Sequence, residues 1–142
     1  MKFFNISIGI LVILSITRFI PHPPNFTSII ALSFYVPILF NIRFLPIIIL
    51  SFALTDLIIG FHNTMLFTWG SVLIIGLLSQ FFLNKLPHRF AGAVFSCIIF
   101  YIITNLGVWF TGIHGNNSFN LLETYKYGIP FFWSTIMSTL LY

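Results

Sequence analysis

Acidic side chains are so scarce in this sequence that each one marks a place where chemistry could occur. Only two carboxylates, Asp56 and Glu123, occur among 142 residues, against six Lys or Arg. Asp56 falls inside an apolar run, and an unpaired acid deep in a bilayer costs about 2.5–3.5 kcal/mol on insertion scales. Arg18 lies at a similar depth in the first apolar run. We therefore expect Arg18 and Asp56 to form a structural charge pair, and Asp56 could also supply a polar wall to a pocket.

The histidines do not follow the spacing of a metal site. His22, His62 and His114 are scattered, no H-E-x-x-H motif occurs, and the lone Cys97 sits in an apolar run. Although imidazole binds zinc, copper, nickel and iron, scattered histidines of this kind are more often ordinary loop residues. We predict no metal and no cofactor.

Motifs of catalysis and of nucleic-acid binding are missing from the sequence. Neither a G-x-S-x-G elbow nor a P-loop occurs, so we predict no enzyme and no ATP hydrolysis by the chain itself. The six basic residues are spread along the chain and form no stripe. A nucleic-acid partner is therefore not expected.

The elements that carry these residues are apolar helices. Hydrophobic residues make up 58% of the chain and charged residues 6%, whereas soluble domains carry about 25% charged residues. We expect an all-α integral membrane protein, multi-pass in the cell's inner membrane, with the lipid bilayer as its partner and one domain over residues 1–142. Six apolar runs predict six helices, at about residues 3–20, 26–40, 44–60, 66–83, 90–110 and 129–142.

Two of these runs are short for a bilayer. A spanning helix needs about 20 residues, because roughly 30 Å of hydrocarbon is crossed at about 1.5 Å per residue. The second and sixth runs have about 14 or 15 residues. They either borrow polar flanks, form short spans or do not cross fully.

The basic residues indicate how the bundle is oriented. With the N-terminus inside, four of them fall on the cytoplasmic side: Lys2, Arg43, Lys85 and Arg89. The other two, Arg18 and Lys126, fall outside. Because cytoplasmic segments carry the excess of Lys and Arg, we expect both termini to be inside.

This orientation brings nearly all the distinctive residues to the outer side, in the first, third and fifth loops. Apolar walls with a few convergent polar groups are typical of small-molecule sites. We expect an outward-facing binding site made of Asn25, Asp56, Phe61, His62, Asn105, Trp109, His114 and Tyr125. Other roles stay open: Asn105 could join helices by hydrogen bonding, Trp109 could be an interfacial residue, and the loops could simply cap short helices.

Several motifs carry a resemblance to known proteins. From Arg18 onward, including Asn105-Leu106-Gly107-Val108-Trp109 and Ile129-Pro130-Phe131-Phe132, the chain resembles an uncharacterised domain-of-unknown-function family of small bacterial multi-pass membrane proteins. More distantly, it resembles the S component of energy-coupling-factor (ECF) vitamin transporters. That resemblance implies six helices, both termini inside, and three outer loops closing over a vitamin site.

The S-component resemblance also implies a partner, an ECF-type transmembrane and ATPase module. Such S components typically carry an Ala-x-x-x-Ala face on their first helix, whereas this first run offers Ser7, Gly9 and Ser15. The expected function is binding and uptake of a small nutrient such as a vitamin. The alternative is a non-transporting structural subunit or assembly factor of a membrane complex.

Overall fold

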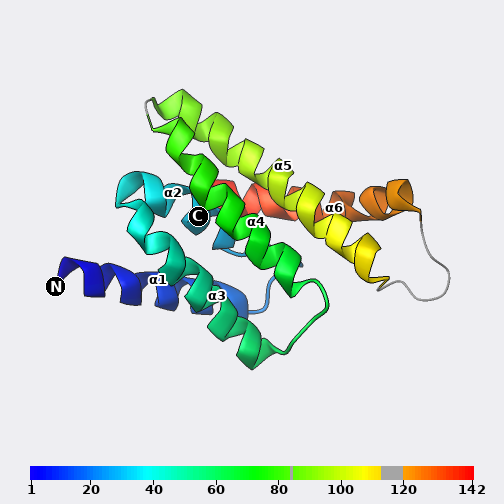
Figure 1. The fold of residues 1–142 in the computed structure, drawn as a ribbon, viewed down its shortest axis with the longest axis horizontal. Helices are drawn as coiled ribbons and strands as arrows, with labels where there is room; N and C mark the ends of the chain where they lie inside the picture. The colour runs from blue at the N-terminus through cyan, green and yellow to red at the C-terminus, as the bar shows by residue number, and fades with distance from the viewer. Residues whose placement is uncertain (84, 113–119) are drawn as a thin grey trace.

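The computed structural model describes residues 1–83, 85–112 and 120–142, and within these ranges every regular element is a helix (Figure 1). His114, one of the expected site residues, lies outside the described residues. The α-helices are α1 (Lys2–Phe19), α2 (Ile29–Leu39), α3 (Leu45–Ile59), α4 (Met65–Leu78), α5 (Leu86–Thr111) and α6 (Leu121–Leu141). Two short 3-10 helices, η1 (Ile42–Phe44) and η2 (Ser79–Phe82), precede α3 and follow α4.

Four helical segments are long and apolar enough to cross a membrane. They are Lys2–Phe19, Ile42–Ile59, Met65–Phe82 and Leu86–Thr111. This confirms the prediction of an all-helical arrangement for the described residues, and it confirms the composition of a membrane span for four of the six helices. Of the two runs that the sequence marks as short, α2 has only 11 residues, whereas α6 has 21.

The short helix α2 lies at the centre of the bundle. It packs against α3, α4, α5 and α6, and seven of its eleven residues are buried, Phe34 among them. Because α2 is surrounded by protein, it does not have to match the thickness of the lipid.

Helix α6 begins at Leu121, well before the expected residue 129, and the cause is local. The Asn120 side chain accepts a hydrogen bond from the Glu123 backbone N–H at 2.9 Å, and Glu123 Oε2 accepts one from the Asn120 N–H at 3.1 Å. This reciprocal capping box satisfies two donors that a helix start leaves open. One of the two acidic side chains is thereby a helix cap.

The connections fall at two ends of the bundle, as the alternation of the helices requires. In Figure 1, α3, α4 and α5 run side by side with alternating direction, and the α3–α4 connection lies at the same end as the last turn of α5. The N-terminus, the α2–α3 connection and the α4–α5 connection lie towards the other end. Helix α1 is peripheral and packs mainly on α3.

The C-terminal end of α6 lies close to the connection between α1 and α2. The ring of Tyr142 lies 6.2 Å from the ring of Phe26, which precedes α2. An outer first loop and an inner C-terminus would place these two rings on opposite sides. The expectation that both termini are inside therefore stays a prediction, and the contact argues for a steeply tilted or incompletely crossing α6.

Candidate functional site

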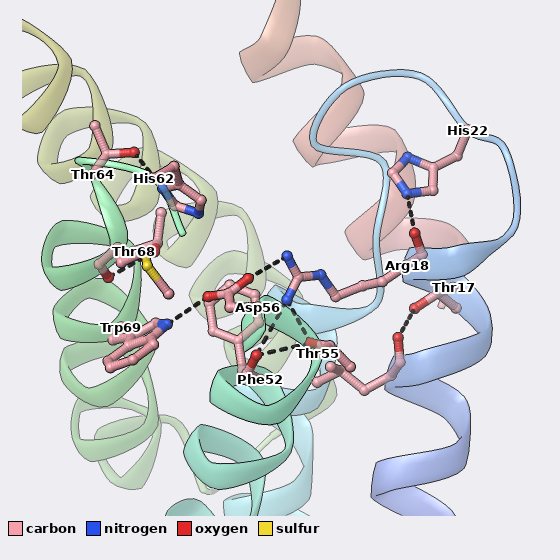
Figure 2. A network of polar contacts seen from close by, with 12 residues as sticks. Thr17, Arg18, His22, Phe52, Thr55, Asp56, His62, Thr64, Thr68 and Trp69 are labelled. Atoms are coloured by element: carbon pink, nitrogen blue, oxygen red, sulfur yellow. Dashed lines mark hydrogen bonds and ion pairs between the residues drawn. The ribbon is translucent and has the colours of Figure 1, made fainter. Parts of the chain in front are cut away.

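Arg18 and Asp56 meet at the end of the bundle where α1 and α3 finish (Figure 2). Arg18 Nη2 lies 2.6 Å from Asp56 Oδ1, and the Asp56 side chain is 0% exposed. Asp56 Oδ2 accepts a hydrogen bond of 2.7 Å from the indole N–H of Trp69 on α4. Burying a charge is costly unless it is paired and hydrogen-bonded. One oxygen of this buried carboxylate, Oδ2, accepts a hydrogen bond, and the other, Oδ1, is compensated by the ion pair with Arg18 and has no hydrogen bond among the described residues.

The Arg18 guanidinium is fixed by further contacts with α3. Its Nη1 donates to Thr55 Oγ1 at 2.5 Å and to the Phe52 carbonyl oxygen at 3.2 Å. The guanidinium carbon lies 4.5 Å from the centre of the Phe52 ring, within the range of a cation–π contact. The structure thus joins the two residues that the sequence pairs, and it adds Trp69, Thr55 and Phe52, which the sequence did not indicate.

A cavity of about 590 Å³ opens beside this pair. Volumes of roughly 300–1,000 Å³ are typical of small-molecule sites. All six α-helices contribute to its wall, which is formed by Arg18, His22, Pro24, Asn25, Thr27, Ile29, Ile30, Phe52, Ile59, His62, Thr64, Thr68, Phe100, Thr104, Asn105, Val108, Thr124, Tyr127, Gly128 and Phe131.

The structure divides the expected site residues into two groups. Asn25, His62 and Asn105 line the cavity. Asp56 does not line it, because it is buried behind Arg18.

The three expected aromatic walls lie outside the cavity lining. Phe61 is 75% exposed and Trp109 is 44% exposed. The hydroxyl of Tyr125 donates to the Ile102 carbonyl oxygen at 2.8 Å, so it is engaged with the backbone of α5. Aromatic rings at other positions take the expected role: Phe52, Phe100, Tyr127 and Phe131.

Helix geometry explains why Trp109 is displaced from the wall. Phe100, Thr104 and Val108 on α5 line the cavity, and residues four apart lie on one face of a helix. Trp109 follows Val108 by one residue, so it points about 100° away at 3.6 residues per turn. Gly107 is buried against α4, where an added Cβ would overlap the side chain of Phe67. Its lack of a side chain serves helix packing.

Asn105 combines the two roles that the sequence left open. Its Nδ2 donates to the Tyr101 carbonyl oxygen at 2.8 Å, within α5. Its carboxamide also lies so close to Gly128 of α6 that an added Cβ there would overlap Oδ1. Asn105 therefore sits at the α5–α6 contact and at the cavity wall together.

Sequence reasoning missed a set of threonines in the wall, namely Thr27, Thr64, Thr68, Thr104 and Thr124. Three of them donate to backbone carbonyls one turn earlier: Thr68 to Met65 at 2.8 Å, Thr104 to Phe100 at 2.7 Å, and Thr124 to the N-cap residue Asn120 at 3.2 Å. Because any helical threonine can make such a bond, a threonine in an apolar run gives no signal that it faces a cavity.

The two histidines at the cavity are held by nearby polar groups. His22 Nδ1 lies 2.8 Å from the Pro23 carbonyl oxygen and His22 Nε2 lies 3.3 Å from the Arg18 carbonyl oxygen. His62 Nδ1 lies 3.0 Å from Thr64 Oγ1. Within the described ranges, no three His, Cys, Asp or Glu residues are placed to hold a metal ion.

Comparison with known proteins assigns the family but no activity. A family of unknown function, DUF6580, matches residues 2–142. The chain belongs to this family. No curated protein and no solved structure matches it. For this DUF6580 chain, any function must therefore be inferred from the geometry of the site.

Proposed function

We propose that this chain is a membrane-embedded binding protein that captures a small nutrient, such as a vitamin, for uptake into the cell. The observation that carries the proposal is the cavity of about 590 Å³, to which every α-helix contributes. Packing alone favours close contact between helices, so a space of this size beside an ion pair favours a ligand.

The chemistry of the wall fits a small-molecule site. Apolar side chains such as Phe100, Val108 and Phe131 alternate with polar ones such as Asn25 and His62. Sites of this kind typically combine an apolar lining with a few polar groups that orient the ligand. Arg18, held by three contacts with α3, is a pre-oriented polar group of this type.

The proposed orientation makes the cavity open to the outside. The cavity lies at the end of α1, opposite the N-terminus, so an N-in chain would present it to the exterior of the inner membrane. The excess of basic residues on the other side supports this orientation. The proposal does not require an ECF-type module, because α1 has no Ala-x-x-x-Ala face.

One set of observations favours the alternative of a structural subunit. The Arg18–Asp56 pair and the Asn105–Gly128 contact both join helices, so each would be needed for packing even without a ligand. The cavity distinguishes the two functions, since a purely structural subunit has no need of it.

Filling the cavity tests the proposal. Thr104→Trp places a large ring at the cavity wall, and Leu106→Trp places one on the same helix at a residue outside the lining. We expect native mass spectrometry of gently purified wild-type protein to show a retained small molecule. Thr104→Trp should lose it and Leu106→Trp should keep it.

Two results would contradict the proposal. One is a wild-type protein that carries no retained molecule even when purified from cells in rich medium. The other is a retained molecule that survives Thr104→Trp, because it would then be bound somewhere else.

A further inference from the structure

The polar groups that face the cavity are biased towards donors and bases. The whole sequence holds only two acidic side chains. Asp56 is 0% exposed behind Arg18, and Glu123 is engaged in the capping box at the start of α6. Neither is part of the cavity wall, whereas Arg18, His22 and His62 are. The cavity therefore presents bases and hydroxyls without an opposing carboxylate.

Counting the donors of Arg18 shows that part of its capacity is unused. A guanidinium carries five N–H donors and cannot be deprotonated in a protein. Two contacts from Nη1, to Thr55 and Phe52, and one from Nη2, to Asp56, account for three of them. Among the described residues, the second N–H of Nη2 and the N–H of Nε have no partner. They belong to a side chain that lines the cavity and is 12% exposed.

Asp56 neutralises the charge of Arg18 overall. A molecule in the cavity would nevertheless lie at different distances from the two charges. The guanidinium forms part of the wall, and the carboxylate lies behind it with no exposed surface. An anionic group at the wall would therefore lie closer to the cation than to the acid. A cationic group there would meet the guanidinium first and would find no acidic side chain to bind.

We infer that the cavity selects a molecule in which an oxyanion, a carboxylate or phosphate, is attached to an apolar body, with the oxyanion bound by Arg18. This inference rests on the proposed function and specifies the class of its ligand. The apolar body would pack against Phe100, Val108 and Phe131. Asp56 acts as a positioning residue, because its ion pair sets the orientation in which Arg18 meets the oxyanion.

Three probes of one shape and different charge test the inference. They are 6-(trifluoromethyl)-2-naphthoate, its neutral primary amide, and the corresponding naphthylmethylammonium cation. The protein is placed in phosphatidylcholine nanodiscs, and each Kd is measured by ¹⁹F NMR titration. We expect the carboxylate to bind at least about tenfold more tightly than the amide, because hydrogen bonds to charged groups are stronger than neutral ones. The ammonium probe should bind most weakly.

Variants assign this preference to Arg18. In Arg18→Gln/Asp56→Asn, both charges are removed together, and the carboxylate should lose its advantage over the amide. Leu106→Trp, outside the lining, should keep the wild-type ratio. Should the double variant fail to fold, the ratio measured in the wild-type protein still decides the question, since it requires no substitution.

The outcomes separate this inference from the proposed function. Equal Kd values for the three probes, all lost in Thr104→Trp, would overturn the anion preference and leave the binding function standing. Binding unchanged by Thr104→Trp would overturn both. If no probe binds, the inference about the ligand is overturned, and the retained molecule in native mass spectrometry still decides the binding function. In nanodiscs that contain phosphatidylglycerol, titrated in high salt that screens the charge of the lipid surface, selective loss of naphthoate binding would support the oxyanion site and identify a lipid phosphate as its occupant. Unchanged naphthoate binding would support a soluble anion.

Discussion

A fully buried acid needs neighbours that replace what water would supply, and at Asp56 these neighbours come from two other helices. Arg18 of α1 supplies a charge at 2.6 Å and Trp69 of α4 a hydrogen bond at 2.7 Å. Of the expected site residues, Asp56 is the one whose role the structure changes most. It supports the site from behind, and Arg18 is the residue that faces the cavity.

The ion pair leads to a prediction about stability at the residue scale. Arg18→Leu leaves the Asp56 charge buried without its cation, and breaking such a pair typically costs about 3–5 kcal/mol. The double variant Arg18→Leu/Asp56→Leu removes both charges and should recover much of that loss. Thermal unfolding in detergent measures the stability of each protein. The melting temperature should be highest for the wild type, lower for the double variant and lowest for Arg18→Leu.

Arg43→Leu provides the control, because Arg43 is exposed on the chain and makes no ion pair among the described residues. It should unfold within a degree or so of the wild type, as surface substitutions usually do. If the double variant is no more stable than Arg18→Leu, Arg18 and Asp56 do not depend on each other.

At the scale of helices, the α5–α6 contact depends on a residue without a side chain. Gly128 faces the Asn105 carboxamide, which is held in place by its bond to the Tyr101 carbonyl oxygen. Tyr101 in turn donates to the Tyr125 carbonyl oxygen at 2.5 Å, and Tyr125 donates back to Ile102. Small residues are common where membrane helices approach closely, and here the close approach also shapes one side of the cavity.

Because of this contact, we expect a substitution at Asn105 to restore the stability that a substitution at Gly128 removes. Gly128→Ala would place a Cβ against Asn105 Oδ1 and should destabilise the protein by about 1–3 kcal/mol, the usual cost of overpacking. Asn105→Ala in the same chain removes the obstructing group and should restore most of the lost stability. Thermal unfolding of the two single variants and the double variant measures the coupling.

Gly70→Ala is the matched control, since an added Cβ at Gly70 would meet nothing within 4 Å. Because alanine favours helix over glycine by about 1 kcal/mol, Gly70→Ala should be neutral or stabilising. A Gly128→Ala protein as stable as Gly70→Ala would show that the α5–α6 contact is looser than the structure has it.

At the scale of the whole molecule, the remaining question is which side of the membrane the cavity faces. Native Cys97 is 1% exposed, so the wild type should not react with a membrane-impermeant maleimide and serves as a background. Single cysteines at exposed positions, Pro23→Cys and Phe61→Cys near the cavity end and Arg43→Cys and Lys85→Cys at the other, report each side separately.

With the N-terminus inside, Pro23→Cys and Phe61→Cys should react in intact cells. Arg43→Cys and Lys85→Cys should react only after the membrane is made permeable. The charge distribution is the physical reason, because positively charged loops are retained in the cytoplasm. The reverse pattern would turn the cavity towards the cytoplasm and would contradict a role in capturing nutrients from outside.

The sequence by itself determined the elements and the principal polar residues. Hydrophobic content and the scarcity of charge required apolar helices, and the cost of an acid in lipid required a partner for Asp56. Asn25 and His62, between apolar runs, and Asn105, within the outer part of the fifth run, were expected at one end of the bundle, and all three line the cavity. Asn120 and Glu123 also held a readable signal, a capping box, which places the start of α6 before its apolar run.

Only the tertiary structure decided which face of each helix turns inward. In a soluble helix the apolar stripe identifies the buried side, but a membrane helix is apolar on the side facing lipid as well as on the side facing protein. The pattern around Val108 and Trp109 therefore could not show that Val108 lines the cavity and Trp109 does not. For the same reason, the sequence could not show that the threonines line the cavity. It also could not show that Asp56 lies behind Arg18, because that arrangement depends on how α1, α3 and α4 pack together.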